Sequence, residues 1–137
     1  PVGKVIAVSH SGWRGTVKQI ARETLKVMQE KFECRPEDVI AAIGPSIGQC
    51  CFETGQEVYD EFIDKLPWSR EYCEMSVAGK WHVNLQGIIK KTLTDAGLKE
   101  DNICISDICT KCNKDIFFSH RGDNGKTGSL AAIIQLL

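Results

Sequence analysis

An apolar run that ends in a histidine and a glycine-flanked turn constrains this chain most. The run Val5–Ser9 reaches His10, and the stretch His10–Gly15 reads His-Ser-Gly-Trp-Arg-Gly directly before a helical pattern. A strand that passes through a glycine turn into a helix is how α/β proteins place functional side chains at a strand end. The helix N-terminus would add unpaired N–H groups beside Arg14. The same pattern is compatible with a tight turn in which Trp13 packs on the core and Arg14 faces solvent.

The remaining hydrophobic pattern predicts an α/β or α+β fold with mixed sheets flanked by helices. Val2–Val8 and Val39–Ile43 have the continuous apolar character of strands buried on both faces. A helical periodicity over Gly15–Phe32 joins them into a βαβ unit with two parallel strands. Further elements are expected as helices over Gln56–Leu66 and between the capping residue Asn84 and the stop residue Gly97, and as strands over Ile103–Asp107, Ile116–Ser119 and Ala131–Leu136.

Length and charge indicate an ordinary globular chain. With 137 residues, of which 42% are hydrophobic and 26% charged, it is long enough for one domain, which we expect to span residues 1–137. The formal net charge of −1 gives no electrostatic reason to expect nucleic acid or a membrane surface as a partner. No apolar run approaches the roughly 20 residues that span a bilayer.

The cysteines admit more than one interpretation. Seven is an odd number that cannot pair completely within one chain, and we expect reduced thiols in a cytoplasmic protein. Cys109 and Cys112, together with Cys104 or with the adjacent Cys50 and Cys51, could bind zinc in a structural knuckle, although the usual four-ligand spacing is missing. Burial as small apolar side chains is the simpler interpretation for most cysteines.

Four segments, in this order and spacing, resemble the laccase-domain family. They are His10–Gly15, Gly44–Glu53 with its adjacent cysteines, Trp81–Leu85, and the region from Cys109-Thr110 through Phe117–Asp123 to Thr127-Gly128. The resemblance runs over nearly the whole chain. Members of this family were first described as multicopper polyphenol oxidases and later assigned as zinc-dependent purine nucleoside phosphorylases, and adenosine deamination is also attributed to them. The resemblance implies stacked mixed sheets with flanking helices, and a small-molecule substrate, a purine nucleoside, used with phosphate.

The resemblance also implies where metal and phosphate bind. Of the three family metal ligands only one has a counterpart here, His10, and the other two, a His and a Cys, belong to a preceding segment about as long as this chain. Because the chain starts directly at Pro1, we expect it to be the C-terminal part of a longer laccase-domain protein. A neutral imidazole at a strand end suits a catalytic zinc, which activates a water or polarises a substrate oxygen. Arg14 is the expected phosphate contact, since a planar guanidinium matches an oxyanion.

Trp13, Arg121 and Asp123 complete the expected substrate-binding set. Arg121 and Asp123 lie in a glycine-rich loop after the aromatic pair Phe117-Phe118, and the resemblance implies that this loop lines the substrate. A solvated turn with a surface Arg–Asp pair is the alternative. The chain departs from the family here, because Gly122 stands where a second arginine is usual.

Three other functions stay open. Copper-dependent polyphenol oxidation is the older family assignment, but three histidines are too few for a four-copper cluster within this chain. A thiol of Cys50 or Cys51, with His82 as its base, would give a cysteine hydrolase if these side chains meet in space. Without the other two metal ligands, the chain could instead be an inactive interaction module whose exposed apolar surface self-associates.

Overall fold

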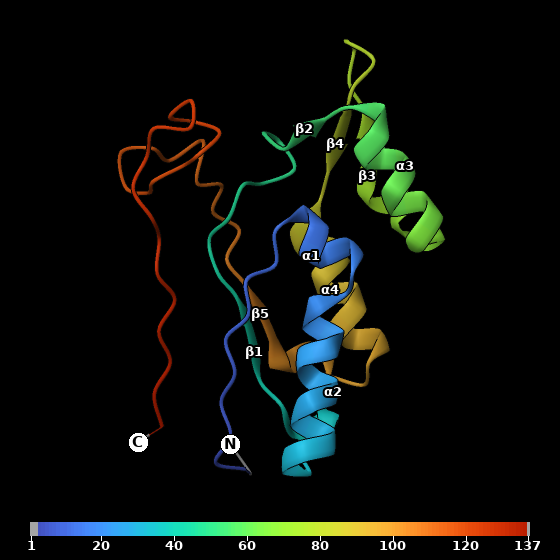
Figure 1. Ribbon diagram of the computed structural model, residues 1–137, viewed down its shortest axis with the longest axis vertical. Helices are drawn as coiled ribbons and strands as arrows, with labels where there is room; N and C mark the ends of the chain where they lie inside the picture. The colour runs from blue at the N-terminus through green and yellow to red at the C-terminus, as the bar shows by residue number, and fades with distance from the viewer. Residues whose placement is uncertain (1–2, 137) are drawn as a thin grey trace. The chain divides into compact units, whose positions relative to one another are not determined.

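The computed structural model describes residues 3–136, which divide into two compact units (Figure 1). The first unit contains the described parts of Pro1–Ile43 and Ala132–Leu137 together with Gln86–Ile105, and the second contains Gly44–Leu85 and Ser106–Ala131. Parallel and antiparallel strand pairs occur beside helices. The predicted mixed α/β class is therefore confirmed, whereas one domain over residues 1–137 stays a prediction.

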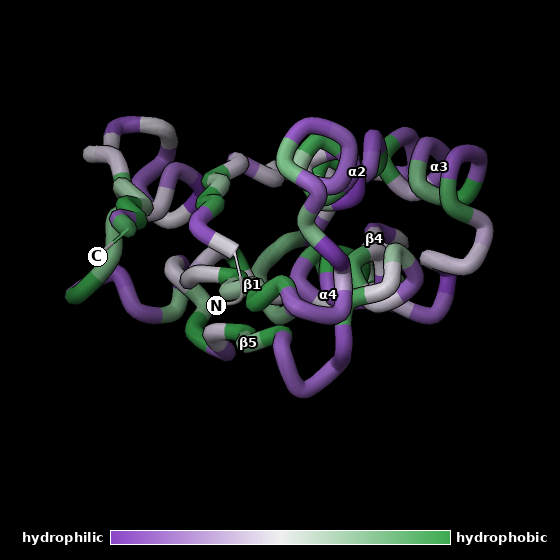
Figure 2. Tube along the Cα trace, turned by 90° about the horizontal axis from the view of Figure 1, so that it is seen from below, coloured by the Kyte–Doolittle hydropathy of each residue, from purple (hydrophilic) through white to green (hydrophobic). Residues whose placement is uncertain are grey.

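An aliphatic core forms the centre of the first unit. Its elements are α1 (Trp13–Val17), α2 (Ile20–Phe32), η1 (Pro36–Asp38), β1 (Ala41–Ile43), α4 (Leu85–Asp95), η3 (Glu100–Asn102) and β5 (Ile103–Ile105). β1 and β5 pair in parallel, and both strands are hydrophobic in Figure 2. Leu25 of α2, Ile89 and Leu93 of α4, Leu98, and Ile103 of β5 form one buried cluster. The spacing of Ile89 and Leu93 places both on one face of α4, which explains why the apolar periodicity predicted this helix.

The long first helix is broken into two. Gln19 has a left-handed backbone with φ 53°, and α1 ends before it. Thr16 and Val17 are adjacent β-branched residues, which lose side-chain freedom in a helix. The Thr16 hydroxyl also bonds to the Gly12 carbonyl oxygen at 3.0 Å, and this kind of side-chain bond to the carbonyl four residues back slightly destabilises a helix. The predicted helix over Gly15–Phe32 is therefore interrupted at Lys18 and Gln19, and the residues on both sides of this break are helical.

Two predicted strands near the chain ends are not formed within the described residues. Val2 lies outside them, and residues 3–8 and 131–136 have no strand assignment (Figure 1). The predicted βαβ unit at the start thus lacks its first strand. A strand requires a hydrogen-bonded neighbour, and apolar side chains alone do not provide one. Several of these side chains are solvent-exposed, including Val8 at 58% and Ile133 at 91%.

A three-stranded antiparallel sheet and one helix organise the second unit. Its elements are β2 (Glu53–Thr54), α3 (Gln56–Lys65), η2 (Pro67–Tyr72), β3 (Cys73–Met75) and β4 (Trp81–Val83), with strand order β2-β4-β3. α3 buries Val58, Tyr59 and Phe62. Tyr59 stacks on Trp81 of β4, with ring centroids 3.6 Å apart, and this contact ties the helix to the sheet.

The predicted strand over Ile116–Ser119 is wrong, because Ile116 ends a turn and none of these four residues forms a strand. The Asn113 carbonyl oxygen accepts the N–H groups of Ile116 and Phe117. These local bonds replace the strand pairing that the aromatic run alone would favour.

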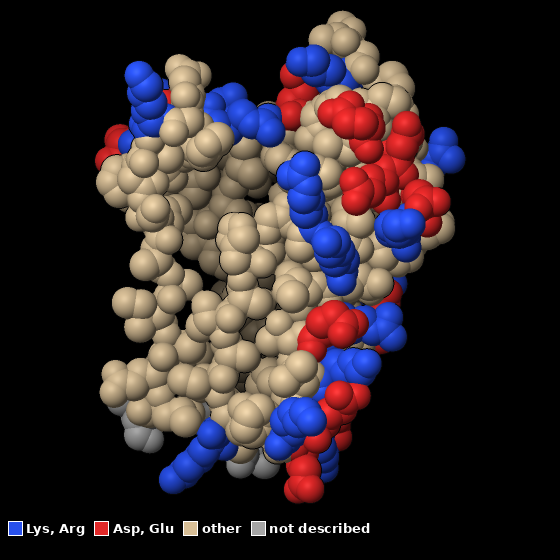
Figure 3. All heavy atoms as spheres, viewed as in Figure 1, with Lys and Arg blue, Asp and Glu red and all other residues tan. Residues whose placement is uncertain are grey.

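Charged side chains of both signs are visible on the right-hand side of Figure 3, and acidic ones gather at its upper right. Lys26 pairs with Glu30, and Lys91 with Asp95, each four residues apart on a helix. Such exposed pairs contribute little to stability. Among the described residues, none of the helices has the length and apolar character that a bilayer-crossing segment needs.

Replacing Gly97 by alanine is expected to lower the free energy of unfolding by about 1–2 kcal/mol. Gly97 follows α4 with φ 101°, and a Cβ there would lie 3.2 Å from Pro36 Cβ. The Leu98 N–H then donates to the Leu93 carbonyl oxygen and closes the helix. Urea unfolding checks the change, with Gly44→Ala as control, since a Cβ on Gly44 meets nothing within 4 Å. Equal losses in both variants would contradict the assignment of strain to Gly97.

Candidate functional site

The loop that carries His10 is held by one buried hydroxyl. Thr16 is 2% exposed, and its Oγ1 lies 3.1 Å from Ser11 Oγ. The same hydroxyl donates to the Gly12 carbonyl oxygen, which also accepts the Thr16 N–H at 2.8 Å. A Cβ on Gly12 would lie 3.2 Å from His10 Nε2, so the glycine allows the imidazole to approach the backbone. His10 itself is exposed, as a side chain that must reach a metal or a substrate requires.

His10, Trp13 and Arg14 line one hollow of about 300 Å³, together with Gly12 and Gly15. The Arg14 guanidinium lies over the Trp13 ring, with Cζ 4.2 Å from the ring centroid. This cation–π contact gives Trp13 a packing role and leaves the Arg14 side chain exposed. The structure thus brings together three of the residues that the sequence singled out. Their roles in binding or catalysis stay predictions.

The helix N-terminus contributes less to this hollow than the sequence predicts. α1 has only five residues, and Gly12 provides no side-chain cap. A short helix sums few peptide dipoles, so it lacks the anion-binding field that a long helix over Gly15–Phe32 would supply. Any anion bound here would depend mainly on the Arg14 guanidinium.

His10 fits a metal site as one ligand, but the described residues do not complete that site. A catalytic zinc has three protein ligands and one open position. Within residues 3–136, the one group of three or more His, Cys, Asp or Glu with converging ligand atoms consists of cysteines and excludes His10. Two further ligands would have to come from outside these residues.

Arg121 lies in the second unit and is engaged by the backbone of β2. Its Nη1 donates to the Glu53 carbonyl oxygen at 2.8 Å. Its Cζ also lies 5.4 Å from the Phe52 ring centroid. Arg121 is therefore held in place while its side chain stays exposed.

Asp123 holds its own loop together. Its Oδ2 accepts the Thr127 hydroxyl at 2.7 Å and the Ser119 N–H at 3.0 Å. These bonds, in that order, and the charge of Lys114 lower the pKa of Asp123. Arg121 bonds to Glu53 instead, so the surface Arg–Asp pair that the sequence offered as an alternative is not what orders this loop. Substrate binding by Arg121 and Asp123 stays a prediction.

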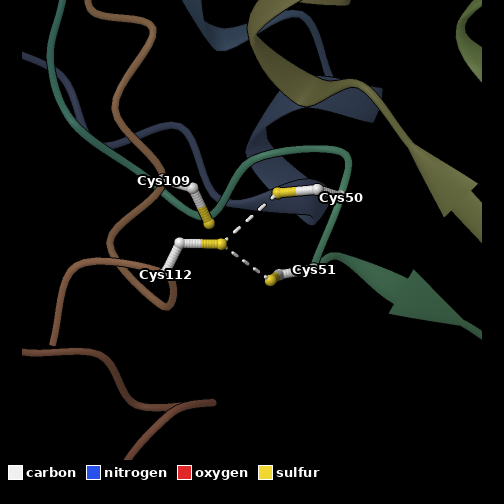
Figure 4. A group of neighbouring side chains, drawn as sticks. All are labelled: Cys50, Cys51, Cys109 and Cys112. Carbon is white, nitrogen blue, oxygen red and sulfur yellow. Dashed lines mark hydrogen bonds between the residues drawn. The ribbon is translucent and has the colours of Figure 1, made fainter.

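Four cysteines of the second unit converge, as Figure 4 shows. Cys112 Sγ lies 3.8 Å from Cys50 Sγ and 3.5 Å from Cys51 Sγ. With Cys109, all four sulfur atoms lie within 4.8 Å of one another. We call these four residues the cysteine quartet. Cys104, which the sequence offered as a partner of Cys109 and Cys112, lies on β5 in the first unit and is not a member.

The thiols of the quartet differ in acidity. Burial opposes ionisation of Cys109, but N–H groups of Gly48 and Cys112 and the thiols of Cys112 and Cys50 bond to its sulfur and lower its pKa to about 6. Burial, followed by the bond to Cys112, raises the pKa of Cys51 to about 12. Burial also raises the pKa of Cys50. Cys109 is thus more acidic than Cys50 and Cys51.

Both ring nitrogens of His82 face oxygen atoms of neighbouring residues. Its Nδ1 lies 2.8 Å from the Gln49 carbonyl oxygen, and its Nε2 lies 3.7 Å from Glu53 Oε2. Cys50 and Cys51, the proposed nucleophiles of a cysteine hydrolase, face Cys112 instead. This arrangement gives no support to a thiol–imidazole pair.

A mixed α/β fold with an exposed histidine and an arginine on one hollow is the kind of scaffold that carries a metal-dependent site. Comparison with known families is consistent with this class, because the family model described as multi-copper polyphenol oxidoreductase laccase matches residues 1–137. The chain belongs to this laccase-domain family.

Curated relatives carry two enzyme names. The chain is 38% identical over 137 residues to purine nucleoside phosphorylase YlmD of Bacillus subtilis, covering 99% of this chain and 49% of that protein. It is 37% identical over 123 residues to adenosine deaminase RL5 from an unknown prokaryotic organism, covering 85% of this chain and 45% of that protein. The chain therefore spans about half the length of these relatives.

Solved structures confirm the fold. The crystal structure of YlmD from Geobacillus stearothermophilus superposes with a TM-score of 0.81 at 36% identity, covering 88% of this chain and 45% of that one. The Bacillus licheniformis hypothetical protein YfiH gives 0.77 at 33% identity, with the same coverage of 88% and 45%.

Proposed function

We propose that the complete protein is a zinc-dependent enzyme of purine nucleosides, which cleaves them with phosphate and also deaminates adenosine. The observation that carries this proposal is that His10 and Arg14, a potential metal ligand and an anion contact, line one hollow. The names of the relatives support the substrate class. The chain spans only about half of those relatives, so the proposal concerns the protein encoded by the complete gene.

The residues that line the hollow have distinct roles in this proposal. His10 donates one imidazole nitrogen to zinc, and two ligands from outside these 137 residues complete the set. Zinc, when bound, supplies a Lewis acid and a means of lowering the pKa of water. Arg14 holds phosphate against the substrate, and Trp13 fixes the Arg14 guanidinium by their stacking contact. Substrate contacts by Arg121 and Asp123 stay a separate prediction from the sequence.

The two reactions differ in their second substrate. In phosphorolysis, the bond between the ribose carbon and the purine nitrogen breaks, a phosphate oxygen bonds to that carbon, and the purine leaves with a proton. In deamination, water adds to the purine carbon that bears the amino group, and ammonia leaves. Only the first reaction needs an anion contact, which is the role of Arg14.

The test is product analysis on the zinc-loaded complete protein. With adenosine and phosphate, we expect adenine and ribose 1-phosphate, and without phosphate we expect inosine. Chromatography separates all of these products. If neither reaction occurs above the uncatalysed rate, the proposed function is wrong.

Arg14→Ala is expected to raise the KM for phosphate by about 10- to 100-fold, the range for loss of a hydrogen-bonded charge. Deamination by the same variant should change by less than about twofold, since it uses no phosphate. Initial rates at varied phosphate concentration check both statements. Arg22→Ala, which removes an exposed arginine of α2, is the matched control. A parallel loss of both activities in Arg14→Ala would point to a structural role instead.

Copper-dependent polyphenol oxidation is the second candidate, because the description of the family names it. Soft thiols bind Cu(I) readily, so the cysteine quartet gives the chain a place to bind copper. Copper in protein purified without added metal, together with phenol oxidation in that preparation, would favour this candidate over the zinc enzyme.

Cytoplasmic localisation and self-association of the chain stay predictions.

A further inference from the structure

The cysteine quartet is built by two loops that the fold pairs directly. Cys50 and Cys51 lie in the loop after Gly48, while Cys109 and Cys112 lie in the segment that follows β5 in the chain. Ser46 and Cys109 form a parallel bridge, and the Thr110 N–H donates to the Ser46 carbonyl oxygen at 3.0 Å. Backbone pairing therefore fixes the distance between the two loops, whether or not the thiols interact.

A backbone turn at Gly48 holds the loop that carries Cys50 and Cys51. The N–H groups of Cys51 and Phe52 both donate to the Gly48 carbonyl oxygen. In Figure 4, Cys50 and Cys51 project toward Cys112, and Cys109 lies beside them. A Cβ on Gly48 would lie 3.1 Å from Cys109 Cβ and 3.4 Å from Cys50 Sγ. Only a glycine fits without displacing the thiols.

The separations of the sulfur atoms match one tetrahedral ion. A zinc–sulfur bond of about 2.3 Å implies sulfur atoms about 3.8 Å apart at the corners of a tetrahedron. Cys112 Sγ lies 3.8 Å from Cys50 Sγ and 3.5 Å from Cys51 Sγ, and the whole quartet fits within 4.8 Å. A disulfide needs about 2.05 Å, and all seven cysteines have free thiols.

Hydrophobic burial does not explain why these thiols gather. Cys50 and Cys112 are exposed and Cys51 is half-buried, so only Cys109 behaves as a core side chain. Two backbone N–H groups, those of Gly48 and Cys112, also donate to Cys109 Sγ. Such N–H donors around a sulfur orient a thiolate ligand and stabilise its charge.

We propose that Cys50, Cys51, Cys109 and Cys112 bind one zinc ion as a closed tetrathiolate site, built from residues other than His10. Four thiolates satisfy all positions of a tetrahedral zinc and leave none for substrate, so the ion is structural. Thiol protons leave to solvent as the zinc–sulfur bonds form. No oxidation or reduction accompanies binding, because zinc has no redox chemistry in proteins. The bound ion joins the two loops of the second unit.

The first experiment measures metal binding by the purified chain. After removal of metal with a chelator under reducing conditions, zinc is added and excess is removed. Mass spectrometry should find about one zinc per chain. Co²⁺ in place of zinc should give the intense visible bands of a tetrahedral tetrathiolate. Absence of these bands, or copper retained in preference to zinc, would overturn the proposal.

Zinc binding by variants distinguishes the quartet from the other thiols and from His10 as the source of the ligands. Cys112→Ser should weaken zinc binding at least about 10-fold, whereas Cys34→Ser and Cys104→Ser, which remove cysteines outside the quartet, should leave it unchanged. His10→Ala should also keep this zinc. Zinc that is lost in His10→Ala but kept in Cys112→Ser would overturn the proposal, while leaving the proposed enzyme site intact.

Alkylation of the unaltered chain provides a readout that does not depend on a variant folding. Zinc should protect Cys50, Cys51 and Cys112 from an alkylating reagent, while the exposed Cys104 should react at the same rate with and without zinc. Peptide mass spectrometry locates the modified residues. If these three thiols react equally with and without zinc, or if Cys51 and Cys112 form a disulfide where zinc should bind, the proposal is overturned.

Discussion

Replacing Phe62 by alanine is expected to lower the free energy of unfolding by about 3–5 kcal/mol. Phe62 is 0% exposed and lies in α3, on the face that packs into the second unit. The substitution removes buried aromatic surface and leaves a cavity that a rigid helix cannot fully close. Because domains of this size are stable by only about 5–15 kcal/mol, the urea midpoint should fall sharply. Far-ultraviolet circular dichroism during urea unfolding measures the change.

Phe32→Ala is the matched control for this prediction. Phe32 is 57% exposed at the end of α2, so removing its ring deletes little buried surface. Its loss of stability should stay within about 0.5 kcal/mol. Losses of similar size in the two variants would mean that Phe62 is not a core residue of the folded protein.

His10→Ala is expected to reduce kcat/KM of the complete protein at least about 100-fold for both phosphorolysis and deamination. Loss of residues that merely orient a metal ligand costs about 10- to 100-fold, and loss of a ligand itself should cost no less. Both reactions should fall together, since both depend on the same ion in the proposed function. Steady-state rates on adenosine, with and without phosphate, test this.

Metal analysis adds an independent measurement to His10→Ala. If both zinc proposals hold, the complete protein should contain about two zinc ions and the variant about one. His82→Gln is the control, since its amide can still donate to the Gln49 carbonyl oxygen that His82 Nδ1 faces. Full activity in His10→Ala would mean that His10 takes no part in either reaction.

Local patterns predicted those elements whose packing is local. α3 and α4 follow from apolar residues at helical spacing, and β1 and β5 coincide with parts of the predicted strands Val39–Ile43 and Ile103–Asp107. The predicted strands over Val2–Val8 and Ala131–Leu136 had the same apolar character, yet their described residues form none. Strand formation depends on a partner, which no single segment specifies.

In the candidate sites too, the sequence predicted groups of chain neighbours but not groups that depend on tertiary packing. The sequence alone grouped His10, Trp13 and Arg14, because they are neighbours on one turn. It also marked Cys50-Cys51 and Cys109-x2-Cys112 as potential ligands, but their convergence depends on the parallel bridge between Ser46 and Cys109. Nothing in the sequence identified Thr16, whose buried hydroxyl orders the His10 loop, because such a role depends on tertiary packing.

The sequence separation within the quartet bears on how the protein is made. Cys51 and Cys112 are 61 residues apart in the chain, and a ribosome adds about 5–20 residues per second. The adjacent cysteines are therefore synthesised about 3–12 s before the last member of the quartet. During that interval they are thiols of a nascent chain, open to oxidants and to stray metal ions. If the quartet binds zinc as proposed, Cys50 and Cys51 must therefore stay reduced until Cys109 and Cys112 have been synthesised.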